Sequence, residues 1–154
     1  MWTPIWQLWS VIRTSPATFS EDALTDMQPP RKINYHTRSK RLDLEWAEQT
    51  CSLPAELLRV YSPSAEVRGH ADSERVLQTG KKHVSITGLE PVGNYAIRIV
   101  FDDGHDSGIY GWDYLRDLNA NQDQYWEAYL AELKAANASR LPTIPVGHFT
   151  PPKS

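Results

Sequence analysis

The feature that most constrains the fold is a strand and hairpin turn between residues 95 and 112. Apolar side chains recur there at every second position, which is the period of a strand that buries one face. They are Tyr95, Ile97, Ile99 and Phe101. The strand runs into an acidic loop at residues 102–108, whose Asp-Gly pair is typical of a hairpin turn. We therefore expect a returning strand and then a short helix carrying Trp112, Leu115 and Leu118.

The preceding chain shows the same alternation. Ile33 and Tyr35 predict one strand, and a second alternation predicts its hairpin partner, which carries Leu42, Leu44 and Trp46. A strand with buried Cys51, a helix after Pro54 and a helix from Asn121 to about Ala136 complete the ordered part. The predicted fold class is α+β, with a small antiparallel β-sheet with hairpins, a short helix after the second hairpin strand and C-terminal helices.

At 154 residues the chain has the length of one ordinary domain. The polar residues 15–27 contribute to the prediction of a disordered N-terminal extension at residues 1–29. The proline-rich last residues predict a flexible tail at residues 139–154. Between them we place a domain at residues 30–119 and a C-terminal helix at residues 120–138.

Charge and cysteine content narrow the function classes. A net charge of −3 and a pI near 5.9 disfavour broad binding of nucleic acid. The single cysteine, Cys51, cannot form an internal disulfide, which fits a reducing compartment. The apolar start, which includes Trp2 and Ile12, is too short to span a bilayer. We expect a cytoplasmic protein with no transmembrane segment.

Two stretches carry a resemblance to a known family. They are Leu57 to His70, LLRVYSPSAEVRGH, and Ile86 to Leu115, ITGLEPVGNYAIRIVFDDGHDSGIYGWDYL. Together they resemble the stand-alone bacterial form of the gamma-butyrobetaine hydroxylase-like N-terminal domain family, over about residues 30–118. The resemblance implies a small α+β domain similar to the N-terminal zinc-binding domain of gamma-butyrobetaine and trimethyllysine hydroxylases. Their oxygenase catalytic domain is absent here, so the resemblance does not predict an enzyme.

The resemblance also implies where a zinc site would lie. In metal-binding relatives a C-x-C-x-x-C cluster follows a Leu-Arg pair, and a histidine after Asp-Gly completes four ligands. Here the cysteine positions fall on Ser62, Ser64 and Val67, and the histidine position falls on His105. Hydroxyl groups stay protonated near neutral pH and valine has no ligand atom, so we do not expect that zinc site in this chain.

The acidic loop leaves two interpretations open. His105 with the carboxylates of Asp103 and Asp106 could hold Fe or Zn, since imidazole and carboxylate are common metal ligands. Alternatively, these acidic residues only cap a turn and His105 packs locally. No cofactor is expected on the second interpretation.

A binding surface is the remaining candidate site. Its predicted residues are Arg59, Arg68, Asn94, Arg98, His105 and Tyr110, a mixture of arginine and aromatic side chains typical of contact surfaces. Core packing is the competing interpretation for Tyr95, Tyr110 and Trp112. Our first hypothesis is a non-catalytic domain that binds an unknown protein partner or a small ligand through residues 62–67 and 102–108. The alternatives are a metal-binding or iron–sulfur-related accessory protein using His105, and an unrecognised enzyme.

Overall fold

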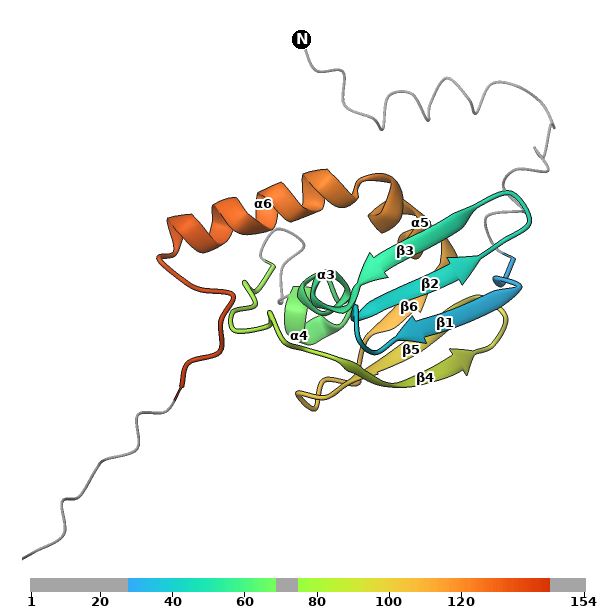
Figure 1. Ribbon diagram of the computed structural model, residues 1–154, viewed down its shortest axis with the longest axis horizontal. Helices are drawn as coiled ribbons and strands as arrows, with labels where there is room; N and C mark the ends of the chain where they lie inside the picture. The colour runs from blue at the N-terminus through green and yellow to red at the C-terminus, as the bar shows by residue number, and fades with distance from the viewer. Residues whose placement is uncertain (1–27, 69–74, 145–154) are drawn as a thin grey trace, which may run out of the picture.

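A computed structural model describes residues 28–68 and 75–144 (Figure 1). The predicted extension up to residue 27 and the end of the predicted tail therefore lie outside the described residues. The elements follow in the order β1 (Lys32–His36), β2 (Arg41–Glu45), β3 (Thr50–Pro54), α3 (Ala55–Val60), α4 (Ala65–Arg68), β4 (Ile86–Val92), β5 (Ala96–Phe101), β6 (Ile109–Gly111), α5 (Trp112–Ala120) and α6 (Gln122–Ala135).

The first three strands form one antiparallel sheet in the order β1-β2-β3. The register places Leu44 between Ile33 and Cys51, so that apolar side chains from all three strands share one face. Leu42 and Leu44 are fully buried, while Asp43 between them accepts a hydrogen bond from the Ser52 hydroxyl at 2.6 Å on the other face. The predicted hairpin, and the burial of Cys51, are confirmed.

The second antiparallel sheet has the order β4-β5-β6 and contains the strand that dominates the sequence pattern. Ile97, Ile99 and Phe101 of β5 are buried, as predicted. Tyr95 is 58% exposed, and the prediction that it joins this buried face is wrong. The reason is that β5 begins at Ala96, so Tyr95 lies in the turn before the strand, where the alternation no longer fixes its side chain.

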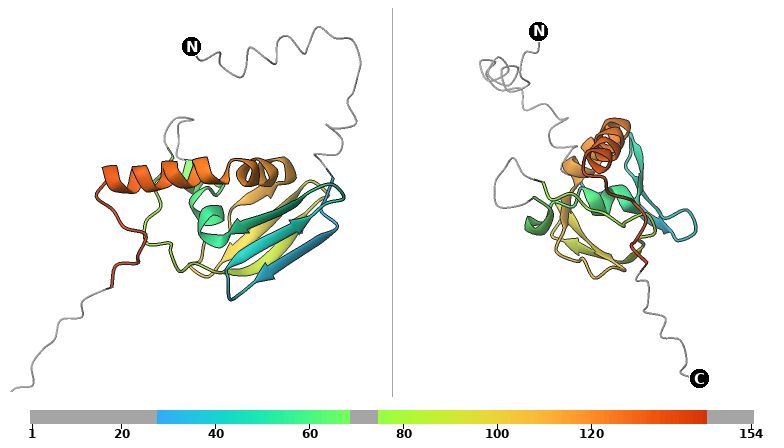
Figure 2. Two further views of the ribbon diagram at one scale, coloured as in Figure 1. Left: turned by 45° about the horizontal axis from the view of Figure 1, so that its top comes forward. Right: turned by 90° about the vertical axis from the view of Figure 1, so that its left-hand side faces the viewer.

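Helix α3 is the centre of the domain. Its six residues are all buried, including Glu56 and Arg59. Figure 2 shows the two sheets inclined to one another, with α3 near them and with α5 and α6 running across their upper side. The buried residues of both sheets, α3, α5 and α6 belong to one hydrophobic cluster, which makes this a single core.

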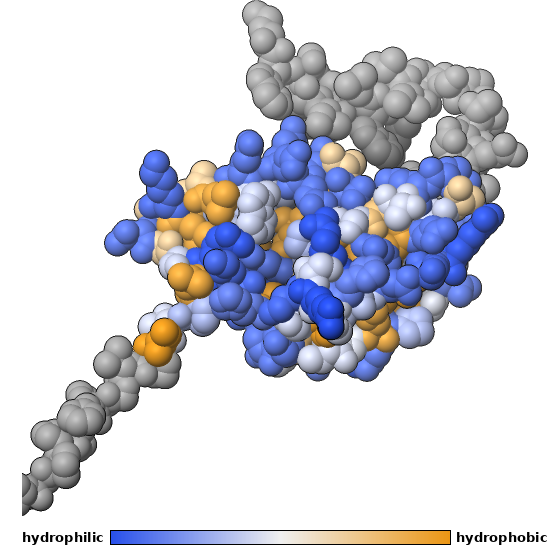
Figure 3. All heavy atoms as spheres, in the orientation of Figure 1, coloured by the Kyte–Doolittle hydropathy of each residue, from blue (hydrophilic) through white to orange (hydrophobic). Residues whose placement is uncertain are grey.

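The C-terminal helices close the core with few side chains. Trp112, Leu115 and Leu118 of α5 are buried as predicted, whereas only Tyr129 and Leu133 of α6 are buried. Apolar atoms are visible on the surface at the left end in Figure 3, over α6 and the segment after it. Within the described residues, no helix has the length and apolar character needed to cross a lipid bilayer.

The α+β class and the antiparallel strands are confirmed, although the strands form two sheets rather than one. Helix α4 was not predicted, because four residues are too few to show a helical period. At the start of the predicted tail, Ser139 and Arg140 accept backbone hydrogen bonds from Gly80 and Lys82, both at 2.9 Å. These residues are therefore attached to the domain.

Distant side chains satisfy the carbonyl groups at the end of α3. The hydroxyl of Tyr110 donates to the Leu58 carbonyl at 2.5 Å, and the hydroxyl of Tyr114 donates to the Tyr61 carbonyl at 2.5 Å. Arg75 donates to the Val60 carbonyl at 3.3 Å. The last carbonyls of a helix have no partner inside the helix, so a buried helix end needs such donors.

We expect Tyr110→Phe to destabilise the domain by about 1–3 kcal/mol, because it leaves a buried carbonyl oxygen without its donor. Burial raises the pKa of Tyr110, so its hydroxyl remains a donor at neutral pH. Urea unfolding curves measure the change, and Tyr95→Phe serves as a control at an exposed tyrosine. Equal unfolding free energies for the two variants would contradict this role.

Candidate functional site

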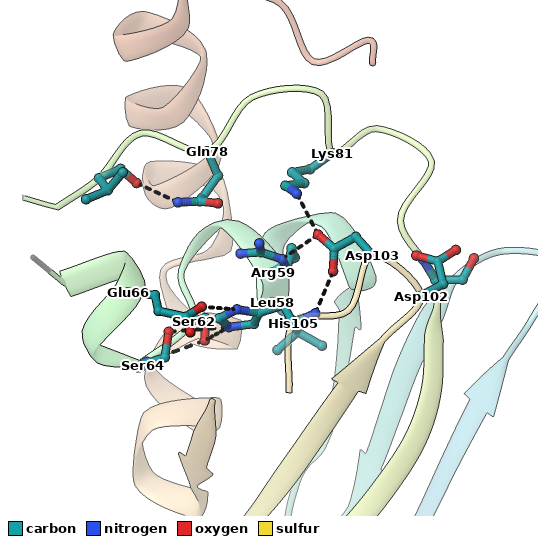
Figure 4. A network of polar contacts seen from close by, with 12 residues as sticks. Leu58, Arg59, Ser62, Ser64, Glu66, Gln78, Lys81, Asp102, Asp103 and His105 are labelled. Carbon is teal, nitrogen blue, oxygen red and sulfur yellow. Dashed lines mark hydrogen bonds and ion pairs between the residues drawn. The ribbon is translucent and has the colours of Figure 1, made fainter. Parts of the chain in front are cut away.

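The loop between β5 and β6 meets the segment around α4 at His105 (Figure 4). The His105 side chain is only 2% exposed. Its Nε2 atom lies 2.8 Å from Ser62 Oγ and 3.3 Å from Ser64 Oγ, and its Nδ1 atom lies 3.0 Å from a carboxylate oxygen of Glu66. The fold therefore brings Ser62, Ser64 and His105 together.

The partners of the His105 ring define its protonation. An ionised carboxylate only accepts hydrogen bonds, so Nδ1 carries the proton that is donated to Glu66. In neutral imidazole Nε2 is then an acceptor, and the nearer hydroxyl, that of Ser62, donates to it. Burial lowers the pKa of His105, and the positive charge of Arg59 lowers it further, while Glu66 and Asp103 oppose this shift. The histidine is therefore neutral at physiological pH.

Asp103 fixes the backbone of the loop. One carboxylate oxygen accepts from Arg59 Nε at 2.8 Å and from Lys81 Nζ at 2.5 Å, and the other accepts from the His105 backbone N–H at 3.1 Å. Burial alone would raise the pKa of Asp103, but these donors outweigh it and hold the pKa at about 2. Asp103 is thus a charged anchor that sets the position of His105.

Ser62, His105 and Glu66 have the hydrogen-bond order of a serine, base and acid relay. Their accessibility is the reverse of what catalysis needs, because Ser62 is buried while the Glu66 side chain is 71% exposed. The loop backbone also covers the serine, since a Cβ atom placed on Gly108 would lie 2.4 Å from Ser62 Oγ. A substrate has no route to this hydroxyl in the observed arrangement, so we do not assign it a nucleophilic role.

Some residues of the predicted binding surface are buried in the structure and others are exposed. Arg59, His105 and Tyr110 are buried and form hydrogen bonds inside the domain, so their placement on a surface is corrected. The reason is that each side chain points inward to a polar partner of another segment: Arg59 to Asp103, His105 to Ser62, and Tyr110 to the Leu58 carbonyl. Asn94 is exposed and Arg98 is partly exposed, and Arg98 forms an ion pair with Glu90. The side chain of Arg68 lies outside the described residues.

The three predicted metal ligands do not converge on one point. Asp103 is engaged by Arg59 and Lys81, and both ring nitrogens of His105 have other partners. Asp106 is exposed. Within residues 28–68 and 75–144, no three side chains of His, Cys, Asp or Glu are grouped as a metal ion would require. Metal binding by His105, Asp103 and Asp106 remains a prediction.

Glu66 and Lys81 were not predicted as site residues. Glu66 contacts a side chain 39 positions away and Lys81 contacts one 22 positions away. A local sequence pattern carries no signal for such contacts, and α4 itself is too short to be recognised from periodicity.

Comparison with models of protein families gives a match that spans Ser62, Ser64 and His105. The sequence model described as gamma-butyrobetaine hydroxylase-like, N-terminal, matches residues 33–116, which is more than half of the chain. The chain belongs to this family. The match extends from β1 into the first half of α5, so the site lies inside the family domain.

Solved structures resemble the gamma-butyrobetaine hydroxylase-like domain over most of the chain. One NMR solution structure is 50% identical with a TM-score of 0.67, covering 81% of this chain and 99% of the other. A second is 44% identical with a TM-score of 0.66, covering 90% and 100%. A crystal structure of a protein with unknown function, of the DUF971 family from Acidithiobacillus ferrooxidans, is 38% identical with a TM-score of 0.52, covering 62% and 97%. No curated protein matches the chain.

The buried histidine makes stability depend on pH. Because burial lowers the pKa of His105 from the ordinary 6.5, the unfolded chain binds this proton more readily than the folded domain. The contribution is fully present above pH 6.5 and is lost as the pH falls below that value. We expect the wild type to lose more unfolding free energy between pH 7 and about pH 5 than His105→Asn, whose amide can still donate to Glu66.

Urea unfolding at each pH measures this difference, and His83→Asn provides the control at an exposed histidine. The ion pairs of Asp103 do not interfere, because its stabilisation is lost only below about pH 4. The assignment would be overturned if His105→Asn and the wild type lost stability in parallel.

Proposed function

We propose that this domain is a non-catalytic binding module whose contact point with a protein partner is Glu66 on α4. The observation that carries the proposal is the pairing of an exposed carboxylate with a buried donor. The Glu66 side chain is 71% exposed, and the His105 side chain that holds it is 2% exposed. The Glu66 carboxylate is therefore accessible to a partner, and the hydrogen bond from the buried His105 ring fixes its orientation.

A fixed carboxylate favours binding for a physical reason. Immobilising a long, flexible side chain at an interface costs roughly 0.5–1.5 kcal/mol of conformational entropy. The hydrogen bond from His105 Nδ1 meets part of that cost before the partner arrives. His105 is itself held by Ser62 and by the anchored loop backbone, so the donor does not need to move.

The charges around Glu66 favour a basic partner. Asp106 of the neighbouring loop is exposed, and its negative charge acts on Arg98, whereas Asp102 lies on the other side of Asp103 from Glu66 (Figure 4) and accepts a hydrogen bond from the Ser85 backbone N–H. Asp103 is neutralised by Arg59 and Lys81. The exposed carboxylate of Glu66 is therefore the negative group that a partner meets, and complementary charge speeds encounter and selects lysine- or arginine-bearing segments.

We expect Glu66→Lys to abolish capture of a partner from the native cell and Glu66→Gln to weaken it about tenfold. Glutamine keeps an oxygen that accepts from His105 but loses the charge, so it separates charge from structure. Glu127→Lys, at an exposed position on α6, is the matched control. Binding is measured against salt concentration, since contacts between exposed charges weaken with salt. Retention of the partner by Glu66→Lys would refute Glu66 as the contact point.

The second candidate function is metal binding at His105, in line with its match to the histidine position of metal-binding relatives. Measurement of metal in protein purified anaerobically without a histidine tag tests it. We expect a substoichiometric amount that is unchanged in His105→Asn, because both ring nitrogens are occupied by hydrogen bonds. A stoichiometric Fe or Zn ion that disappears in His105→Asn would favour the metal-binding function over the partner-binding module.

A further inference from the structure

A second polar site lies away from His105, in a cleft between α3 and the first half of α6. The cleft has a volume of about 330 Å³, within the range of small-ligand sites. Its walls include Glu56 and Leu57 of α3, Asp123 and Trp126 of α6, and Arg140 from the segment after α6. Apolar, aromatic and acidic groups therefore face one space.

The cleft already contains a guanidinium group. Arg140 donates to both carboxylate oxygens of Glu56, from Nε at 2.8 Å and from Nη2 at 2.6 Å. Its Cζ atom lies 4.6 Å from the centre of a Trp126 ring. The Glu56 side chain is only 8% exposed, whereas that of Arg140 is 32% exposed. A buried carboxylate and an aromatic face are the two groups that recognise a planar guanidinium.

The segment that delivers Arg140 is distinct from the elements that form the pocket. Backbone hydrogen bonds connect Ser139 to Gly80 and Arg140 to Lys82, and no helix or strand includes residues 139–141. Leu141 is exposed beside them. The acceptor Glu56 and the stacking residue Trp126 belong to helices, so they keep their positions if this segment detaches.

We propose that this cleft is an arginine-binding pocket, filled within the chain by Arg140 and available to an arginine of a partner protein when residues 139–141 detach. Arginine fits better than lysine, because its planar fork engages both Glu56 oxygens and stacks on Trp126, whereas an ammonium is a point charge. The cleft volume remains when Arg140 is in place, which leaves space for the rest of an incoming residue. This pocket shares no lining residue with the site of His105 and Glu66, and the proposal does not depend on partner binding by Glu66.

The test uses Arg140→Ala in the full chain, with N-acetyl-arginine amide as the probe and N-acetyl-lysine amide as its control. We expect the arginine probe to raise the thermal unfolding midpoint of Arg140→Ala and to bind, by NMR titration of the Trp126 indole signal, at least tenfold more tightly than the lysine probe. The wild type should bind the arginine probe at least tenfold more weakly than Arg140→Ala, because its own Arg140 competes.

Two variants locate the effect. Arg140→Ala combined with Glu56→Gln should lose the response, because the pocket then lacks the buried carboxylate that engages the guanidinium with both oxygens. Arg75→Ala removes another guanidinium, which stacks 4.2 Å over Tyr61 and pairs with Glu132, and it should not gain a response. If Arg140→Ala does not fold, Arg140→Lys replaces it in the same titration. The proposal is overturned if Arg140→Ala does not bind the arginine probe or binds the lysine probe equally well. It is also overturned if the combination with Glu56→Gln still responds, or if the wild type binds the arginine probe as tightly as Arg140→Ala.

Discussion

The whole structure depends on the burial of one short helix that carries two charged side chains. Helix α3 has six residues, all of them buried, and two of these are charged. Neither buried charges nor helix-end carbonyl groups are tolerated without partners. Different parts of the chain supply these partners: Asp103 pairs with Arg59, Arg140 pairs with Glu56, and Tyr110 donates to the Leu58 carbonyl. Within the described residues, Nη1 of Arg59 is the one buried polar side-chain atom of α3 that has no hydrogen-bond partner. The polar requirements of α3 therefore fix where the later segments lie.

Both candidate sites originate in these requirements. Arg59 holds Asp103, Asp103 holds the backbone of His105, and the imidazole of His105 orients the exposed carboxylate of Glu66. In the same helix, Glu56 pairs with Arg140 in the cleft beside Trp126. Arg59 is thus connected through Asp103 and His105 to the exposed Glu66, and Glu56 is connected directly to Arg140, which solvent can reach. A rigid core thus places polar groups at the surface with little freedom.

Local patterns in the sequence were enough for the regular elements but not for these connections. The alternation of Ile97, Ile99 and Phe101 predicts β5, and the helical spacing of Trp112 and Leu115 predicts α5, because each reflects one buried face. Arg59 was expected on a surface, since arginine is seldom buried without a partner. Its partner lies 44 positions away, and the partner of Glu56 lies 84 positions away, which no local period reveals. The family resemblance supplied what periodicity could not, by aligning Ser62, Ser64 and His105.

Because Gly108 lies so close to Ser62, a single additional carbon atom at position 108 would change the position of the loop. A side-chain carbon at position 108 would lie 2.4 Å from the hydroxyl oxygen, so the two segments meet without spare room. The missing Cβ at position 108 is therefore what allows the loop backbone to lie against Ser62, and any other residue there would push the loop and the serine segment apart.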